Sequence, residues 1–89
     1  MHKLPIRRTF NIGNYESLSV EWTGEHEDIQ QARLLANRQI LEIVQQDLIR
    51  IVNTRAAAGV TTPLLFDIQN HLWQQLSLEL EGINRELNR

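Results

Sequence analysis

Two runs of alternating apolar and polar residues flank the pair Gly13-Asn14, and the phase of these runs constrains the fold more than any other feature of the sequence. The first run covers residues 4–12 and breaks its alternation only at Arg8, and the second covers residues 16–22. The apolar positions are Leu4, Ile6, Phe10, Ile12, Leu18, Val20 and Trp22. A period of two is typical of strands with one buried face. The sequence therefore predicts a β-hairpin over about residues 4–22.

The length of the turn decides whether the apolar faces of the two strands coincide. A two-residue loop of Gly13-Asn14 would pair Phe10 with Ser17, and so place an apolar side chain beside a polar one. Because a shift of one residue reverses every side chain, the hairpin needs a three-residue loop or a bulge that adds one residue. Phe10 then pairs with Leu18, and Gly13 or its neighbour takes a positive φ. A phosphate-binding loop would instead need several glycines before a helix.

From about residue 25 to residue 58 the apolar spacing changes to the period of a helix. Thr23-Gly24 suits a cap, and the acidic residues Glu25, Glu27 and Asp28 suit the positive end of the helix dipole. The apolar positions fill an arc of roughly 200°, wider than one neighbour covers, and the helix would be about 50 Å long. We therefore expect this helix to pack on the hairpin, on a second helix and on another chain.

Gly59 and Pro63 mark the boundary between this helix and a second one. Gly59 suits the left-handed conformation that follows a helix, Thr62 suits a cap, and Pro63 suits the first helical position. The second amphipathic helix is predicted over about residues 63–87, with Gly82 on its solvent side. The predicted fold class is α+β, with an N-terminal β-hairpin followed by two long antiparallel helices (ββαα), in an oligomer.

Length and composition bound the class of protein. A chain of 89 residues buries only about 60% of its unfolded surface, so we expect a single domain over residues 1–89. The sequence has no cysteine, and therefore neither a disulfide nor a thiolate-bound metal supplements the core. The formal net charge of −2 gives no general attraction to nucleic acid. No apolar run has the roughly 20 residues of a membrane span, so we expect a cytoplasmic protein without a membrane partner.

The residues that often carry chemistry predict neither catalysis nor a metal site. His2, His26 and His71 are too far apart in sequence for an i,i+4 ligand pair, and no cysteine supplements them. The serines stand in no nucleophile-elbow context, and a helical hairpin of this size seldom encloses a pocket. We therefore predict a non-enzymatic protein that needs no cofactor and no metal.

Polar residues interrupt the apolar arc of the first predicted helix at Arg33, Asn37, Asp47 and Arg55. They would either form an interchain polar set that fixes register, or mark a seam between two apolar stripes and reach solvent. The width of the arc, the unpaired edges of a two-stranded hairpin and the lack of disulfides together predict a twofold dimer or a tetramer. The predicted interface residues are Ile40, Val44, Asp47, Leu48 and Ile51, with Asp47 pairing with Arg33 or Arg50.

The sequence predicts a non-catalytic, self-associating interaction or structural module, whose partner is itself or another protein. The alternative is a nucleic-acid-binding accessory protein that uses the polar face of the hairpin. Its cations would neutralise phosphates and its aromatic ring would stack on bases, although a solvated outer face has the same composition. The candidate contacts are Lys3, Arg7, Thr9, Asn11 and Tyr15.

The segment from Phe10 to Ser17, FNIGNYES, resembles the leading hairpin of small, mostly uncharacterised proteins from phages and mobile elements. The resemblance covers about residues 8–20, and an acidic helical segment follows here as it commonly does there. The second predicted helix, which contains Trp73, is not matched. The resemblance implies a phage-type accessory or DNA-associated protein and transfers no catalytic residue.

Overall fold

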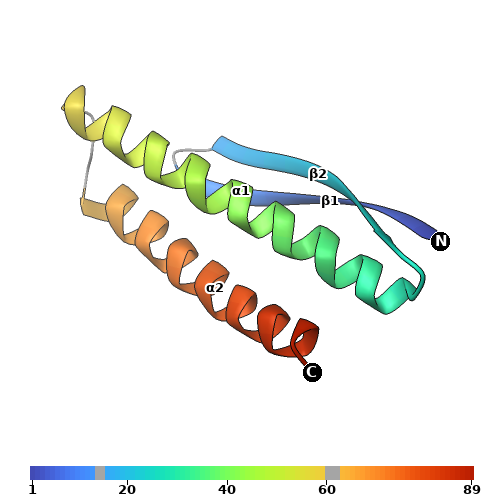
Figure 1. Ribbon diagram of the computed structural model, residues 1–89. Helices are drawn as coiled ribbons and strands as arrows, with labels where there is room; N and C mark the ends of the chain where they lie inside the picture. The colour runs from blue at the N-terminus through green and yellow to red at the C-terminus, as the bar shows by residue number, and fades with distance from the viewer. Residues whose placement is uncertain (14–15, 60–62) are drawn as a thin grey trace.

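The computed structural model describes residues 1–13, 16–59 and 63–89, the last of these with side chains from residue 67 onward. The elements in chain order are β1 (His2–Gly13), β2 (Glu16–His26), α1 (Ile29–Ala57) and α2 (Pro63–Leu87). The two strands form an antiparallel hairpin and the two helices follow, which is the predicted ββαα order. All four elements run along the long axis of a molecule of 48 × 22 × 18 Å (Figure 1).

The register of the hairpin confirms the prediction that an extra residue is needed. Phe10 pairs with Leu18, and the ladder is irregular between Asn11 and Gly13, where Ile12 is the additional residue. Gly13 has the predicted positive φ, at 90°, and its N–H donates to Oδ1 of Asn11 at 2.9 Å. The bulge lets the apolar sides of both strands share one face. Asn14 and Tyr15 lie outside the described residues.

One face of the hairpin, the inner face, packs on the helices. α1 contacts both strands, whereas α2 contacts α1 and β1 but no described residue of β2 (Figure 1). The core forms where these elements meet and consists of Phe10, Ile40, Leu41, Val44, Leu76 and Ile83. The hairpin and α1 therefore form the main packed pair, and α2 closes the side of the core next to β1.

The first helix begins later than the sequence predicts. β2 continues to His26 and α1 starts at Ile29, so the prediction of a helix from about residue 25 capped by Thr23-Gly24 is wrong. Asp28 is the N-cap, and its Oδ1 accepts hydrogen bonds from the N–H groups of Gln30 and Gln31 at 2.7 and 3.3 Å. The first turn of α1 contains no acidic residue.

Gly24 belongs to the strand because of its contact with α1. A Cβ on Gly24 would lie 1.9 Å from the carbonyl oxygen of Ala32 and 3.1 Å from the Cβ of Ala36. Both alanines are fully buried, and their small side chains let β2 lie directly on the helix backbone. The glycine is therefore required for packing rather than for helix capping.

The boundary between the helices follows the sequence prediction. Gly59 has a φ of 71°, and the N–H groups of Ala58 and Gly59 donate to the carbonyls of Thr54 and Ala56, both at 3.1 Å. The αL glycine after the last helical turn satisfies carbonyls that would otherwise lack a donor. α2 begins at Pro63, and the predicted cap Thr62 lies outside the described residues.

Three of the predicted interface residues are already buried within one chain. Ile40 and Val44 are 0% exposed and Leu48 is 2% exposed within one chain, so they have no surface to lose on assembly. The reason is that the strands, at about 3.3 Å per residue, extend for nearly the whole length of α1. The chain's own hairpin and α2 cover most of the apolar arc, although Ile29 stays 44% exposed, and the length of α1 no longer argues for a second chain. Asp47 and Ile51 are half-buried.

Candidate interaction surface

The hairpin face opposite the helices, the outer face, is exposed to solvent. It carries four of the five residues predicted as nucleic-acid contacts: Lys3, Arg7, Thr9 and Asn11. The fifth, Tyr15, lies outside the described residues. The structure thus brings four of the predicted contacts together on one surface.

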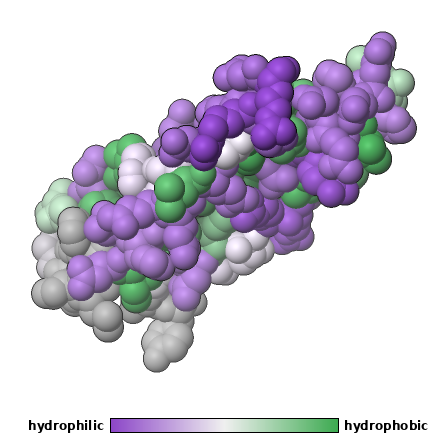
Figure 2. Space-filling view, turned by 90° about the horizontal axis from the view of Figure 1, so that it is seen from below, coloured by the Kyte–Doolittle hydropathy of each residue, from purple (hydrophilic) through white to green (hydrophobic). Residues whose placement is uncertain are grey.

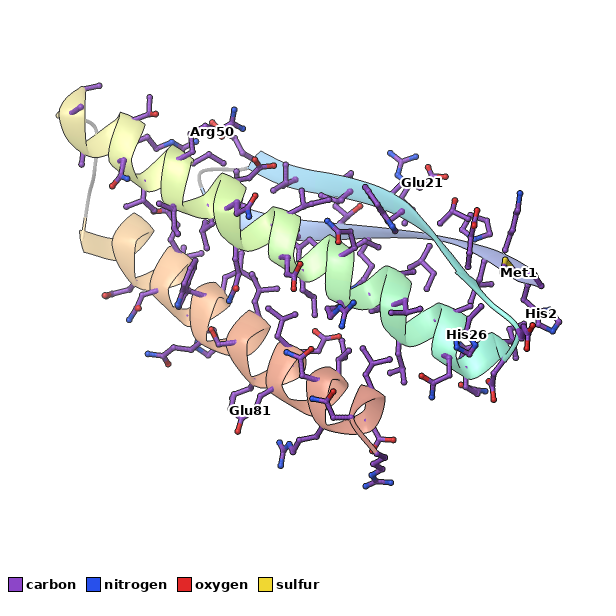
Figure 3. The ribbon with its side chains drawn as sticks, viewed as in Figure 1. Met1, His2, Glu21, His26, Arg50 and Glu81 are labelled. Atoms are coloured by element: carbon purple, nitrogen blue, oxygen red, sulfur yellow. The ribbon has the colours of Figure 1, made fainter. Side chains whose placement is uncertain are left out.

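The cations of the outer face stand opposite carboxylates. Lys3 pairs with Glu25, with 4.0 Å between Nζ and Oε1, and Arg7 is the register partner of Glu21. Glu21 projects away from the helices, as the outer face does (Figure 3). Opposite charges placed across an antiparallel pair stabilise its register. They also leave this face without the positive excess that attracts phosphates.

Arg8 breaks the alternation of the first strand because it has a partner on α2. Its guanidinium forms two hydrogen bonds with the carboxylate of Glu79, at 2.6 and 3.2 Å, and a third with Oδ1 of Asn37 at 3.3 Å. It also lies 5.0 Å from the centre of the Phe10 ring, within the range of a cation–π contact. Arg8 therefore joins β1 to both helices, and its place among apolar neighbours was the one sequence signal for this role.

The polar residues within the apolar arc of α1 have partners in their own chain. Asp47 pairs with Arg50 at 3.2 Å, and Arg55 forms an ion pair with Glu16 at the start of β2. Asn37 accepts the hydrogen bond from Arg8 described above. Arg33 is exposed to solvent. These contacts agree with the interpretation that the polar positions mark a seam between two apolar stripes.

The sheet has two strands, so within the described residues each strand has one edge with no neighbouring strand. Proline has no N–H, and Pro5 therefore suits a position whose N–H would point away from β2. Because such positions alternate, the register places the outward-pointing groups of β2 at its odd-numbered residues. We call these residues the β2 edge: Ser17, Ser19, Glu21, Thr23 and Glu25.

Apolar side chains lie beside the β2 edge. Trp22 belongs to the inner face of β2 but is 45% exposed and lies outside the core cluster. On α1, Ile43 is half-buried and lies outside the core cluster. The β2 edge thus combines unpaired backbone groups with the incompletely covered side chain of Trp22.

The face that carries α2 differs from the β2 edge. Seen from below, its described part is mostly hydrophilic, and its hydrophobic areas are small and separate (Figure 2). Leu78 is 68% exposed there, with the exposed polar residues Gln74, Gln75 and Glu81 about one turn away. Isolated exposed leucines are common on protein surfaces and do not indicate a binding site.

A groove of about 230 Å³ lies between α1 and α2. Its described lining is apolar side chains and side-chain amides, namely Leu48, Ile49, Val52, Asn53, Gln69, Asn70 and Trp73. None of these residues is an acid, a base or a nucleophile. The groove is smaller than the roughly 300 Å³ at which ligand pockets begin.

The hairpin brings together two histidines that are distant in sequence. His2 and His26 are register partners at the open end of the hairpin (Figure 3). Nδ1 of His26 accepts the N–H of Asp28 at 2.9 Å, so one of its two ligand positions is used. The described residues contain no group of three or more histidine, cysteine, aspartate or glutamate side chains placed to hold a metal ion.

Neither described helix combines the length and the apolar content needed to cross a membrane. A scan against protein-family models finds no match, and searches of curated proteins and of solved structures find none either.

Proposed function

We propose that this chain is a non-catalytic protein-interaction module that self-associates, as a twofold dimer or as a tetramer of such dimers. The observation that carries the proposal is a sheet whose described residues form two strands, 12 and 11 residues long, each with one unpaired edge. Long edge strands present rows of unpaired N–H and C=O groups, which readily pair with another chain. Pairing the edges would therefore stabilise both the sheet and the complex.

The small core supports the same proposal. A chain of 89 residues without cysteine has no disulfide to supplement its packing. Two-stranded sheets are marginally stable unless further strands or a packed helix support them. Here α1 already supports one face, and a second chain would add two further strands.

Binding of nucleic acid is the less well supported alternative. Lys3, Arg7, Thr9 and Asn11 share an exposed face, but Glu21 and Glu25 stand opposite its two cations, as described above. A role as a phage-type accessory protein rests on the resemblance of the hairpin alone. This role is compatible with either function and does not favour one over the other.

Sedimentation equilibrium at micromolar concentration tests the proposal directly. The monomer mass is 10.4 kDa, and we expect twice or four times this value. A folded species at the monomer mass, identified by its helical circular dichroism, would refute self-association. A titration with single-stranded and duplex DNA at two salt concentrations tests the alternative, because binding through phosphates weakens steeply with salt.

A further inference from the structure

We infer that two copies of this chain pair through the β2 edge, antiparallel and about a twofold axis at Val20, so that their hairpins form one four-stranded sheet. The inference rests on the proposed self-association and specifies its surface, its partner and its register. The strand order in the dimer is β1-β2-β2-β1.

The position of α2 selects β2 over β1 as the pairing edge. Arg8 and Glu79 join β1 to α2, and the side-chain amide of Gln69 on α2 approaches the carbonyl of Ile12 on β1 at 3.5 Å. α2 therefore lies on the β1 side of the hairpin, whereas its described residues make no contact with β2 (Figure 1). A strand added beside β1 would meet α2, and a strand added beside β2 would not.

The pair of helices is wider than the hairpin that it covers, and this difference favours a closed, twofold pairing over a head-to-tail row. Each hairpin contributes two strands, or about 9.6 Å of sheet. Two packed helices need about 16–20 Å, so a row of identical hairpins would force the helices of neighbouring copies to overlap. With a twofold axis at the β2 edge, the two α2 helices lie on opposite outer sides of the dimer. The contact then uses the same surface of both copies and ends at two.

The charges and the apolar side chains of β2 select the register. An axis at Glu21 would set two carboxylates directly opposite each other, which destabilises a strand pair. An axis at Val20 sets Glu21 opposite Ser19 of the second copy, and a hydroxyl can donate to a carboxylate. It also sets Trp22 opposite Leu18 of the second copy. Trp22 is 45% exposed in one chain, and this register covers it.

The path of α1 under β2 brings the middle of the helix to the same axis. At one end of β2, Gly24 lies against Ala32 near the start of α1. At the other end, Glu16 pairs with Arg55 near the end of α1. Val20 is midway along β2 and therefore lies over the middle of α1.

The flank of α1 opposite α2 suits a contact with its copy. The side-chain amide of Gln45 donates to Ser77 at 2.9 Å, which directs this flank of α1 toward α2. Ile43 lies about 200° away around the helix, and Arg50 follows it two turns later on the same side. Arg50 projects from α1 next to the start of β2 (Figure 3). α1 contacts both strands, and a helix midway between them lies about 4.8 Å from the axis, so the two α1 helices are about 9.6 Å apart, a distance at which helices pack.

A matched pair of proline substitutions tests the inference. Ser19→Pro removes an N–H that points out from the β2 edge, and Thr9→Pro removes the equivalent N–H from β1. Thr9 and Ser19 are register partners joined by a hydroxyl hydrogen bond of 2.9 Å, so both variants lose the same side-chain bond. Pro5 already occupies an equivalent position of β1.

We expect wild type and Thr9→Pro to sediment as dimers with similar dissociation constants. Because the interface is twofold, Ser19→Pro removes the backbone hydrogen bond from residue 19 to the other copy twice. It should therefore raise the dimer dissociation constant by about a hundredfold. Equal constants for Ser19→Pro and wild type, or dissociation of Thr9→Pro alone, would overturn the inference while leaving self-association intact. A monomeric wild type would instead refute the proposed function, and this inference with it.

Amide hydrogen exchange of the wild-type protein provides a test without substitution. In the inferred dimer the N–H groups of Ser19 and Glu21 are bonded to the second copy, whereas those of Arg7 and Thr9 face solvent. We expect slow exchange for the first pair and fast exchange for the second. Fast exchange of all four amides in a dimeric sample would show that the β2 edge is unpaired. This measurement decides the question even if Ser19→Pro fails to fold.

Discussion

Gly24→Ala should destabilise this protein more than an ordinary glycine substitution, because the added methyl group would meet backbone. Its Cβ would lie 1.9 Å from the carbonyl oxygen of Ala32, and ordinary contacts begin at 3.4 Å, so β2 and α1 would have to separate by about 1.5 Å. A methyl group has no other rotamer, and the carbonyl of Ala32 belongs to the helix backbone, so no side-chain rotation relieves this contact. Overpacking typically costs about 1–3 kcal/mol, and we expect about 3 kcal/mol here. For a domain of this size that lowers Tm by roughly 12–24 °C.

Gly82→Ala is the matched control. A Cβ at Gly82 meets no atom within 4 Å, and neither glycine has a positive φ. The substitution in the interior of α2 should therefore raise the free energy of unfolding by about 0.5–1 kcal/mol. Both variants are compared with wild type by thermal and urea denaturation at one protein concentration, since association would shift Tm. Surface substitutions without structural effect usually change the free energy of unfolding by less than about 0.5 kcal/mol. If Gly24→Ala stayed within this range, the close contact of β2 with α1 would be disproved.

Three further sets of substitutions test the cap, the core and the Arg8 contact by chemical denaturation. Asp28→Ala removes the acceptor for the N–H of Gln30 and should cost about 1 kcal/mol, whereas Asp28→Asn keeps an acceptor and should cost little. Leu76→Ala empties a core position that is 2% exposed and should cost about 2–5 kcal/mol, and an unchanged midpoint would contradict its place in the core. A double-mutant cycle of Arg8→Met and Glu79→Gln should give a coupling of about 1 kcal/mol, and strict additivity would show that the bidentate pair contributes nothing.

Local patterns predict the hairpin well because its constraints are local. Phe10 and Leu18 must share a face, and only an extra residue in one strand achieves this, so the alternation alone predicts the bulge that the structure has next to Gly13. Gly59 and Pro63 likewise carry backbone preferences that need no distant partner. The order ββαα follows from these signals.

The errors in the prediction concern contacts between distant segments. Thr23-Gly24 suits either a helix cap or the end of a strand, and the contact of Gly24 with Ala32 decides in favour of the strand. The partner of Arg8 lies 71 residues away in sequence, beyond the reach of any local pattern. The width of the apolar arc of α1 indicates how many neighbours the helix has. It does not indicate whether they belong to the same chain, and here the hairpin and α2 supply them.

The contact between Arg8 and Glu79 bears on association as well as on stability. A two-stranded sheet has two edges, and a protein with both edges open can add copies without limit, as filaments do. In this chain Arg8 holds α2 against β1, whereas the described residues of α2 make no contact with β2. The proposed dimer thus uses its one accessible edge and leaves none for a third copy. An arginine among apolar neighbours of a strand is unfavourable for packing, but at this position it would limit strand pairing to two chains.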